Sequence, residues 1–470
     1  MQSLTRRLFV RNGIVGLGAA LLATACGSAS TPAAAPSPAA TTAAAPSSSQ
    51  PAPAATSAAS SNAATKLIWT GWNVVDFFNP IGAQFTKENP DIGVQYIALP
   101  DYKKQTTMLA AGDVDDVLNT RDDDLAGYAD AGFIVPLDTA FPGVKEVNAD
   151  TYEGNLSAMT YKGKQYGLCY YTDYNTLMYN ADMLSQLNLT APPANLDELK
   201  QQAMSFKDKK VADFPIYMWL QQESNFKEPM YAMMAASGIQ VVDGNGNAVA
   251  DNPELIKLLD WMVDAFQTSK IMDLANLNMV DDDTTNDFMA GKHVFNSQNR
   301  YDLRKLNDPK QSKVAVAGKQ VFKSMIQPGL GQQSKGTVSW TRQYTVNAKS
   351  KFADAARKLQ FFAGAKNKDG VYWTAKSLHD RYGLGFAYKS LATDADIVAA
   401  EKSWGDPDLF TKQKETAAPR QGLQAPWYSE WDNAMQAEWH KAILKQQTSS
   451  QSVKNIAEKW TELQKQNGNG

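Results

Sequence analysis

Aromatic and polar residues stand together at the ends of several strand-like runs of this sequence. Trp72 and Asn73 follow the run LIWT, and Trp219 ends the run FPIYMWL. Asp122 and Asp123 follow another strand-like run. Flat rings surrounded by carboxylates and amides supply stacking surfaces and hydrogen bonds, which is the chemistry of noncovalent binding. A structural role stays open as an alternative, because tryptophans are mostly buried and aspartates favour helix N-termini.

The sequence contains no catalytic motif that we recognise. It has no G-x-S-x-G nucleophile elbow, no G-x-x-x-x-G-K-[ST] phosphate loop and no H-E-x-x-H zinc motif. Its three histidines, at 293, 379 and 440, are far apart, so we expect no metal site and no cofactor. Residues 243–254 resemble a calcium loop, but Ala248 stands where the sharp turn requires glycine. A hairpin turn leading into a helix is the better interpretation.

Length and charge narrow the class of protein. The chain has 470 residues, which allows about two or three domains. Its 46 basic and 49 acidic residues give a net charge of -3, which excludes recognition of a polyanion such as nucleic acid by bulk charge. Hydrophobic residues make up 43%, which is typical of a globular protein with a large core.

The first 65 residues predict export and tethering rather than fold. TRRLFVR resembles the twin-arginine export signal, and the apolar run that follows it is too short to span a membrane. Residues 23–26 resemble a bacterial lipobox, so we expect a signal peptide over 1–25 and lipidation of Cys26. Residues 26–65 are almost entirely Ala, Pro, Ser and Thr, which predicts a disordered tether. Cys169 is then left without a disulfide partner, and we expect it to be a buried small hydrophobic residue.

Beyond residue 66 the pattern alternates between strands and helices. We expect strands over 67–72 and 92–99, and helices over 76–89 and 102–111. This order favours an α/β fold with a parallel sheet covered by helices on both faces. Ligands of such folds bind at the carboxyl ends of the strands.

Six segments in order resemble one protein family over nearly all of residues 66–466. They are FTKENPDIGVQY, MLAAGDVDDVLN, YADAGFIVPLD, YKGKQYGLCYYTDYNTLMYNADML, PPANLDELK and DFMAGKHVF. In this order they resemble the extracellular solute-binding proteins of ABC importers, especially the sugar-binding branch that includes maltose-binding protein.

The resemblance implies an α/β fold of two lobes that close on a ligand like a clamshell around a hinge. It places 66–172 and 326–375 in the first lobe, and 173–325 and 376–470 in the second. The segment 172–176 is the first candidate for the hinge.

The resemblance also implies a carbohydrate ligand. A sugar has apolar C–H faces and hydroxyl edges, so it needs aromatic surfaces bordered by polar groups. Trp340 stands where the family usually has glycines, and Asn299 and Arg300 stand where it often has a glycine and a tryptophan. Arg342 shares a strand face with Trp340. The complete set of predicted ligand-binding residues is Trp72, Asn73, Asp122, Asp123, Tyr171, Trp219, Asn299, Arg300, Trp340, Arg342, Arg381 and Trp427.

Several functions stay open from the sequence alone. A neutral sugar or oligosaccharide is the first choice, and the arginines leave an anionic sugar derivative as the second. A glycoside hydrolase is the enzymatic alternative, since folding can bring two acids together, and a surface adhesin is a third possibility. The preferred interpretation is a monomeric, non-enzymatic binding protein, lipid-anchored on the extracytoplasmic face of the cell membrane. Its partners would be a permease pair and cytoplasmic ATPases.

Overall fold

The computed structural model describes residues 63–468, except 73, 100, 101, 114, 139, 223–226 and 250. The signal peptide, Cys26, nearly all of the tether and Asn73 lie outside the described residues. None of the described helices is long and apolar enough to cross a membrane.

The first lobe begins with the predicted alternation of strands and helices. Strand β1 (Thr65–Gly71) pairs in parallel with β2 (Ile92–Ala98) and β3 (Val117–Arg121). Helices α2 (Val75–Glu88) and α3 (Tyr102–Ala111) connect the strands, and α4 (Asp122–Asp130) follows β3. The four predicted elements are confirmed to within two residues at each end. Helix α2 forms because Phe77, Phe78, Ile81 and Phe85 recur at helical spacing and bury one face.

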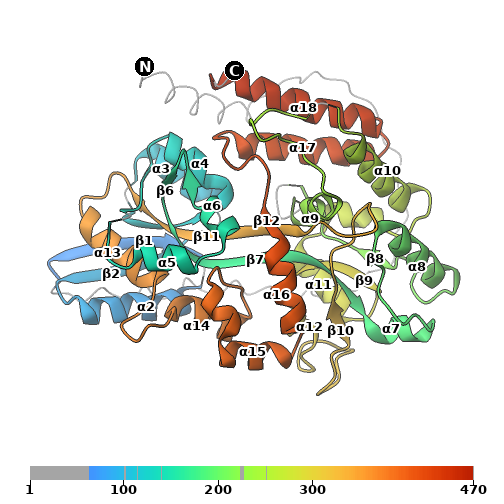
Figure 1. Ribbon diagram of the computed structural model, residues 1–470, viewed down its shortest axis with the longest axis horizontal. Helices are drawn as coiled ribbons and strands as arrows, with labels where there is room; N and C mark the ends of the chain where they lie inside the picture. Colours follow the sequence, from blue (N-terminus) through green and yellow to red (C-terminus); the bar gives the residue numbers. More distant parts are fainter. Residues whose placement is uncertain are drawn as a thin grey trace, which may run out of the picture.

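Two long strands pass from one lobe to the other. The first half of β7 (Leu168–Asn180) pairs with β11 (Thr337–Asn347), and its second half pairs with β9 (Phe295–Asn299). The short strand β12 (Ala417–Pro419) runs beside β11 as a third crossing segment. The main sheet is therefore continuous, in the order β2-β1-β3-β11-β7-β9-β8, and joins both halves in Figure 1. The predicted hinge at 172–176 coincides with the change of partners along β7.

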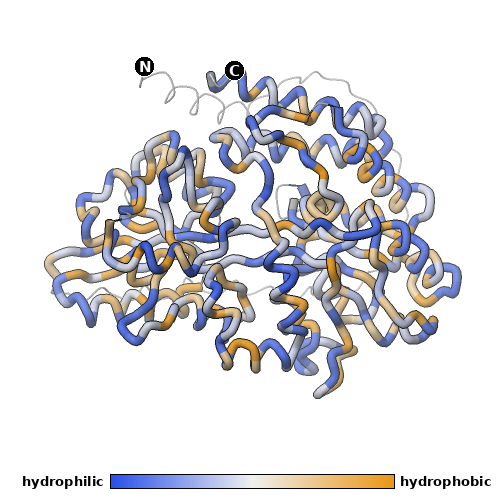
Figure 2. Tube along the Cα trace, in the orientation of Figure 1, coloured by the Kyte–Doolittle hydropathy of each residue, from blue (hydrophilic) through white to orange (hydrophobic). Residues whose placement is uncertain are grey.

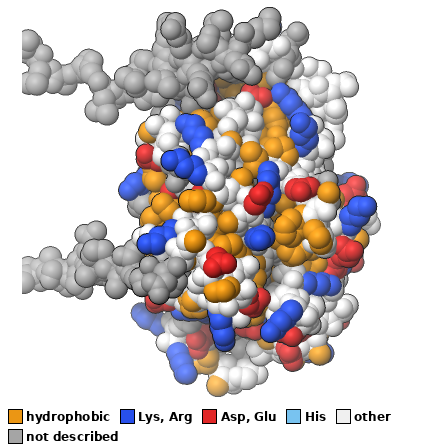
Figure 3. Space-filling model, turned by 90° about the vertical axis from the view of Figure 1, so that its left-hand side faces the viewer, with side chains coloured by type: hydrophobic (Ala, Val, Ile, Leu, Met, Phe, Trp, Pro, Cys, Tyr) orange, Lys and Arg blue, Asp and Glu red, His pale blue; other side chains and the backbone are white. Residues whose placement is uncertain are grey.

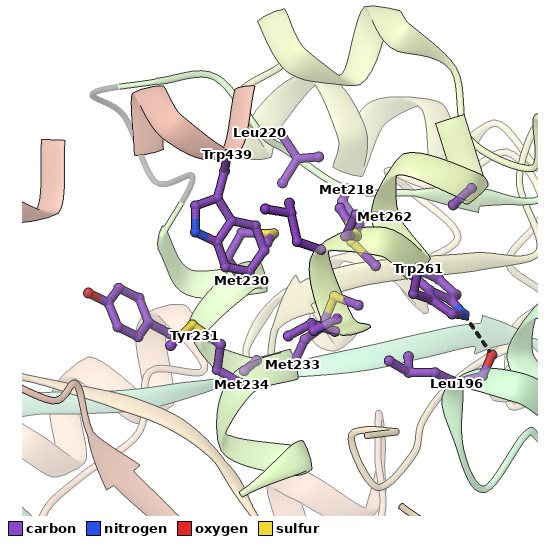
Figure 4. Close-up of a cluster of buried hydrophobic side chains, with 14 of the residues drawn as sticks. Leu196, Met218, Leu220, Met230, Tyr231, Met233, Met234, Trp261, Met262 and Trp439 are labelled. Carbon is purple, nitrogen blue, oxygen red and sulfur yellow. Dashed lines mark hydrogen bonds between the residues drawn. The ribbon is translucent and has the colours of Figure 1, made fainter. Parts of the chain in front are cut away.

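The second lobe has a methionine-rich core. Strand β8 (Ile216–Tyr217) extends the sheet, and α9 (Lys227–Ser237), α10 (Pro253–Gln267) and α17 (Tyr428–Ile443) surround this core. Figure 4 shows Met230 of α9 beside Trp439 of α17, and both side chains, like that of Met233, are fully buried. The indole of Trp261 donates a hydrogen bond of 3.1 Å to the carbonyl of Leu196. Helix α18 (Ser449–Gln466) packs on α17, and its trace alternates between hydrophobic and hydrophilic residues in Figure 2.

Further helices and short strands complete both lobes. The remaining elements are β4 (Ile134–Val135), α5 (Val144–Asp150), α6 (Glu153–Ala158), β5 (Thr160–Tyr161), β6 (Lys164–Gln165), α7 (Ala181–Gln186), α8 (Leu196–Asp208), η1 (Leu274–Asn278), α11 (Asp281–Met289), α12 (Asp302–Leu306), β10 (Phe322–Ser324), α13 (Ala353–Gly364), α14 (Trp373–Tyr382), η2 (Lys389–Thr393), α15 (Ala395–Lys402) and α16 (Pro407–Thr416). Figure 3 shows the end of the molecule formed by the first lobe. On its described part, basic, acidic and hydrophobic side chains are interspersed.

The packing of the C-terminal third bears on the predicted lobe boundaries. Leu378 of α14 and Ile397 of α15 lie in core clusters with first-lobe residues such as Phe78 and Leu168. Helices α17 and α18 pack in the core of the second lobe. The boundary at 376 stays a prediction, and this packing favours a later position for it.

Two smaller predictions are confirmed by the local structure. The segment from Asp243 is a turn, in which the Asp243 carboxylate accepts hydrogen bonds from the amides of Asn245 and Asn247. Helix α10 then starts at Pro253, capped by the side chain of Asn252. Cys169 is buried on β7, and burial raises the pKa of its thiol to about 12.

Candidate functional site

A cavity of about 990 Å³ lies between the two lobes. Its wall combines residues that follow β1 and residues of β7 and β11 with residues that end or follow β9. Six of the predicted ligand-binding residues line it, namely Trp72, Tyr171, Asn299, Trp340, Arg342 and Arg381. The fold brings them together because β7 and β11 cross between the lobes and Trp72 stands at the carboxyl end of β1.

Aromatic rings that brace one another form one wall of this cavity. The ring of Trp72 meets the rings of Tyr170 and Tyr171 edge to face, with centroids 5.6 Å and 5.2 Å away. The indole nitrogen of Trp340 donates a hydrogen bond of 3.0 Å to the hydroxyl of Tyr171. Tyr301 completes the group, edge to face with Tyr171 at 6.4 Å. These contacts hold the rings in place before any ligand arrives, which lowers the entropic cost of binding.

Two buried oxygens in the wall have no hydrogen-bond partner among the described residues. They are Oδ1 of Asn299 and Oδ2 of Asp302. The amide nitrogen of Asn299 donates to the hydroxyl of Tyr301 at 2.9 Å, which orients the amide. Burial, followed by the nearby charge of Asp281, raises the pKa of Asp302 well above its usual value. The Asn299 oxygen can accept a hydrogen bond, and the raised pKa makes the Asp302 carboxyl easier to protonate and so to act as a donor, so the two groups suit a hydroxyl group.

The arginines of the cavity mostly have partners within the protein. Arg342 lies 3.1 Å from a carboxylate oxygen of Asp122, and Arg121 lies 2.8 Å from Asp124. The guanidinium of Arg304 donates to the carbonyl of Asp380 at 2.9 Å. Arg381 is exposed and stacks over the ring of Tyr382, 5.2 Å from its centroid.

Asp122 and Asp123 do not line the cavity, because they belong to a buried ionic network behind it. Both stand in the first turn of α4, where the helix dipole favours carboxylates. Arg420 lies 2.7 Å from Asp122 and 3.6 Å from Asp123, and 3.5 Å from Glu228 on α9. The side chains of Arg420 and Asp122 are both 0% exposed. The network therefore joins the first helix turn after β3 to the second lobe, and Asp122 also positions Arg342.

The side chain of Arg300 is buried at the crossing strands, where it forms ion pairs. Its guanidinium makes two hydrogen bonds of 3.0 Å with the carboxylate of Asp173 on β7. It also lies 3.3 Å from Glu401, which in turn lies 3.4 Å from His379. Arg300 lines a different cavity from that of Trp340, on the other side of the crossing strands.

Two predicted tryptophans stand away from the interlobe cavity. Trp219 is 0% exposed and lines neither of the two cavities. Trp427 precedes α17 and packs edge to face on Trp460 at 6.0 Å. Trp219 is fully buried and Trp427 is partly buried against the second-lobe core, so a structural role, which the sequence left open, fits both.

Sequence reasoning missed several residues of the cavity. Arg121 directly precedes the aspartate trio, so its position next to a strand end was a signal that could have found it. Trp404 and Tyr382 carry no such signal, because they line the cavity from the turn after α15 and from the end of α14, which are distant in sequence from the strands of the cavity wall. No group of three or more metal-ligating residues occurs within the described ranges.

Comparison with known proteins agrees with this architecture. The family model described as bacterial extracellular solute-binding protein matches residues 71–368. The maltose-bound MalE3 of T. maritima superimposes with a TM-score of 0.71 at 21% identity, over 85% of this chain and 100% of that chain. An ABC transporter solute-binding protein from Agrobacterium vitis S4, with bound D-mannitol, gives a TM-score of 0.67 at 22% identity, over 86% and 99%. The two-lobe fold predicted from the sequence is thereby confirmed.

Curated relatives match a smaller part of the chain. A protein of Brucella abortus (strain 2308) that is named as a binding protein is 27% identical over 196 residues. The match covers 40% of this chain and 46% of that protein, which is less than half of the relative's length. The family model, in contrast, spans more than half of the chain. This chain belongs to the family of bacterial extracellular solute-binding proteins.

Proposed function

We propose that this protein captures a neutral sugar or polyol in the interlobe cavity, as the binding component of an ABC importer. The observation that carries the proposal is the convergence of Trp72, Tyr171 and Trp340 with the polar groups of Asn299 and Asp302 on one cavity. Aromatic rings suit the C–H faces of a sugar, and paired donors and acceptors suit its hydroxyl groups. The solved structures of similar fold include proteins with bound maltose, D-mannitol and cycloalternan.

The ion pairs of the cavity favour a neutral ligand over an anionic one. Arg342 and Arg121 already face carboxylates of the protein, so their charge is largely compensated. The wall also contains Glu228, which repels an anion. Of the arginines that line the cavity, Arg304 and Arg381 form no ion pair in the described part of the chain, and Arg304 already donates to the carbonyl of Asp380. A carboxylated or phosphorylated sugar would therefore gain one strong contact and meet opposing charge elsewhere.

The protein captures its ligand when the two lobes close around the hinge. A ligand that touches both lobes lowers the free energy of the closed form relative to the open form. Trp72 and Trp340 approach it from the first-lobe side and the crossing strands, and Asn299 approaches it from the end of β9. The closed form would be recognised by a membrane permease coupled to cytoplasmic ATPases, and the solute would be released chemically unchanged.

The location of the protein follows from its first 65 residues. Export through the twin-arginine signal, lipidation of Cys26 and the Ala/Pro/Ser/Thr tether would hold a monomer at the extracytoplasmic face of the membrane. Metabolic labelling with a radioactive fatty acid tests this. Label that appears on the wild-type chain and is lost in Cys26→Ala supports the anchor, and unlabelled wild-type protein refutes it.

A binding experiment tests the proposed ligand class. Isothermal titration against neutral mono- and oligosaccharides, polyols and sugar acids should find its tightest ligand among the neutral compounds. Trp340→Ala should weaken that ligand by about thirtyfold or more, the loss expected for a central aromatic contact. Trp427→Ala, a tryptophan outside the cavity, is the matched control and should bind normally. Tightest binding by a sugar acid would refute the neutral class. An unaltered affinity of Trp340→Ala would remove that residue from the site, and product formation would favour the hydrolase.

A further inference from the structure

A second cavity, of about 550 Å³, lies against all three crossing segments. Its wall includes Thr172 and Tyr174 of β7, Ser339 of β11 and Pro419 of β12. Successive residues of a strand point to opposite faces. Ser339 therefore faces away from Trp340, which lines the interlobe cavity, and Thr172 faces away from Tyr171 in the same way. We call this second space the hinge cavity, and it lies behind the strands that form the wall of the interlobe cavity.

A lysine without a counter-ion stands in the hinge cavity. The ammonium of Lys414, on α16, lies 3.8 Å from the centroid of the Phe386 ring and 4.8 Å from that of Tyr152. It donates a hydrogen bond to the carbonyl of Phe386. Within the described part of the chain it forms no ion pair. The two rings and the carbonyl stabilise the ammonium only in part, so a bound anion would supply the negative charge that the protein does not place there.

The nearby carboxylates are engaged elsewhere. Asp173 makes two hydrogen bonds with Arg300 and accepts a third, of 2.8 Å, from the amide of Gly385. Glu401 faces Arg300 and His379. Burial, with the charge of Arg300 as a second cause, lowers the pKa of Lys414 to about 7, although Asp173 and Glu401 act in the opposite direction. The protein therefore leaves this lysine without the anionic partner that a buried ammonium normally has.

Hydrogen-bonding and charged groups complete the hinge cavity. The side chain of Ser339 is buried, and its hydroxyl has no hydrogen-bond partner among the residues described. At the rim, Glu153 and Glu415 are exposed and form no ion pair in the described structure, and the exposed Lys389 donates to the carbonyl of Ala149 at 3.2 Å. Lys414 thus offers one unpaired cation at the inner end, and the rim, with Glu153 and Glu415 against Lys389, is on balance acidic, which disfavours a multiply charged anion.

We propose that the hinge cavity binds a small zwitterion of amino-acid size, with its carboxylate at Lys414 and Ser339 and its ammonium toward Glu153 and Glu415. This site is separate from the interlobe cavity, and binding there does not depend on the function proposed for that cavity.

Titration calorimetry of the purified full-length protein tests the site directly. The probes are glycine, leucine and glutamine as zwitterions, with acetate and inorganic phosphate as anions. We expect at least one zwitterion to bind more tightly than acetate and phosphate, and Lys414→Met to weaken it at least tenfold. Lys414→Arg should retain part of the affinity, because it keeps the charge. Trp340→Ala is the control for the interlobe cavity and should bind the zwitterion normally.

Three results would overturn the proposal. These are no binding of any zwitterion, tighter binding of phosphate than of every zwitterion, and undiminished binding in Lys414→Met. Ser339→Ala provides a second variant if Lys414→Met does not fold, and it should also weaken the zwitterion. Sugar binding is measured on the same variants. A variant that loses zwitterion binding and binds sugar normally concerns the hinge cavity alone, so the two proposals can fail independently.

Discussion

The ionic network of Asp122 allows the sharpest test of how this fold is held together. In Asp122→Asn the side chain keeps its shape and loses its charge. Asp122 accepts hydrogen bonds from Arg420 at 2.7 Å, from Arg342 at 3.1 Å and from the amide of Thr341 at 2.9 Å. Because Arg420 is 0% exposed, water cannot replace the lost carboxylate. The remaining acids, Asp123 and Glu228, are farther away, at 3.6 Å and 3.5 Å.

The expected loss of stability is large. Removing one partner of a buried ion pair typically lowers the free energy of unfolding by about 3–5 kcal/mol, because it leaves an uncompensated buried charge. Asp123 and Glu228 still compensate part of the charge of Arg420, so we expect Asp122→Asn to lie at the lower end of this range, at about 3 kcal/mol. Urea denaturation followed by tryptophan fluorescence measures it. The double variant Asp122→Asn, Arg420→Met should lose less than the sum of the two single losses, since the two side chains act on each other.

An exposed pair serves as the control. Glu254 and Lys257 lie 2.8 Å apart on α10, with side chains 52% and 63% exposed. Glu254→Gln should cost less than about 1 kcal/mol, as exposed pairs do. If Asp122→Asn costs no more than this control, or if the double variant shows strict additivity, the buried charges of the network do not stabilise the fold.

Four further predictions follow from buried groups. Burial lowers the pKa of His293, so below pH 6.5 the unfolded chain binds more protons than the folded protein. The free energy of unfolding should therefore fall as the pH decreases through this range. Denaturation of His293→Gln should show a weaker pH dependence. The pKa of Lys414 is lowered from 10.5 to about 7, so stability should rise between these pH values in the ligand-free protein, and Lys414→Met should remove this part of the rise. Gly385→Ala would place a methyl group 2.3 Å from the carbonyl of Thr172, so a lower thermal midpoint is expected in a melting experiment. Met262→Ala empties a fully buried position, and urea denaturation should show a loss of about 2–5 kcal/mol.

Local patterns were sufficient for the elements that form around their own apolar faces. The strands near Leu67 and Ile92 and the helix around Phe85 were predicted within two residues at each end, because burial of alternate or helically spaced side chains is a local property. The sequence at Trp219, in contrast, predicted a strand ending at a ligand contact. Strand β8 covers only Ile216–Tyr217, and Trp219 is completely buried. A tryptophan that follows an apolar run has the same sequence pattern whether it contacts a ligand or is buried in the core.

The sequence by itself determined the alternation of strands and helices, the membership of a two-lobe family, and six of the residues around the interlobe cavity, which are half of those it predicted. Only the tertiary structure decided which charged side chains are free to meet a ligand. Asp122 and Arg342 both satisfy a sequence criterion for a polar site residue, yet Arg420, which is 298 positions away from Asp122, holds that carboxylate in a buried ion pair. The reason is that charge pairing depends on distance and burial in space. Neither quantity can be read from the order of residues along the chain.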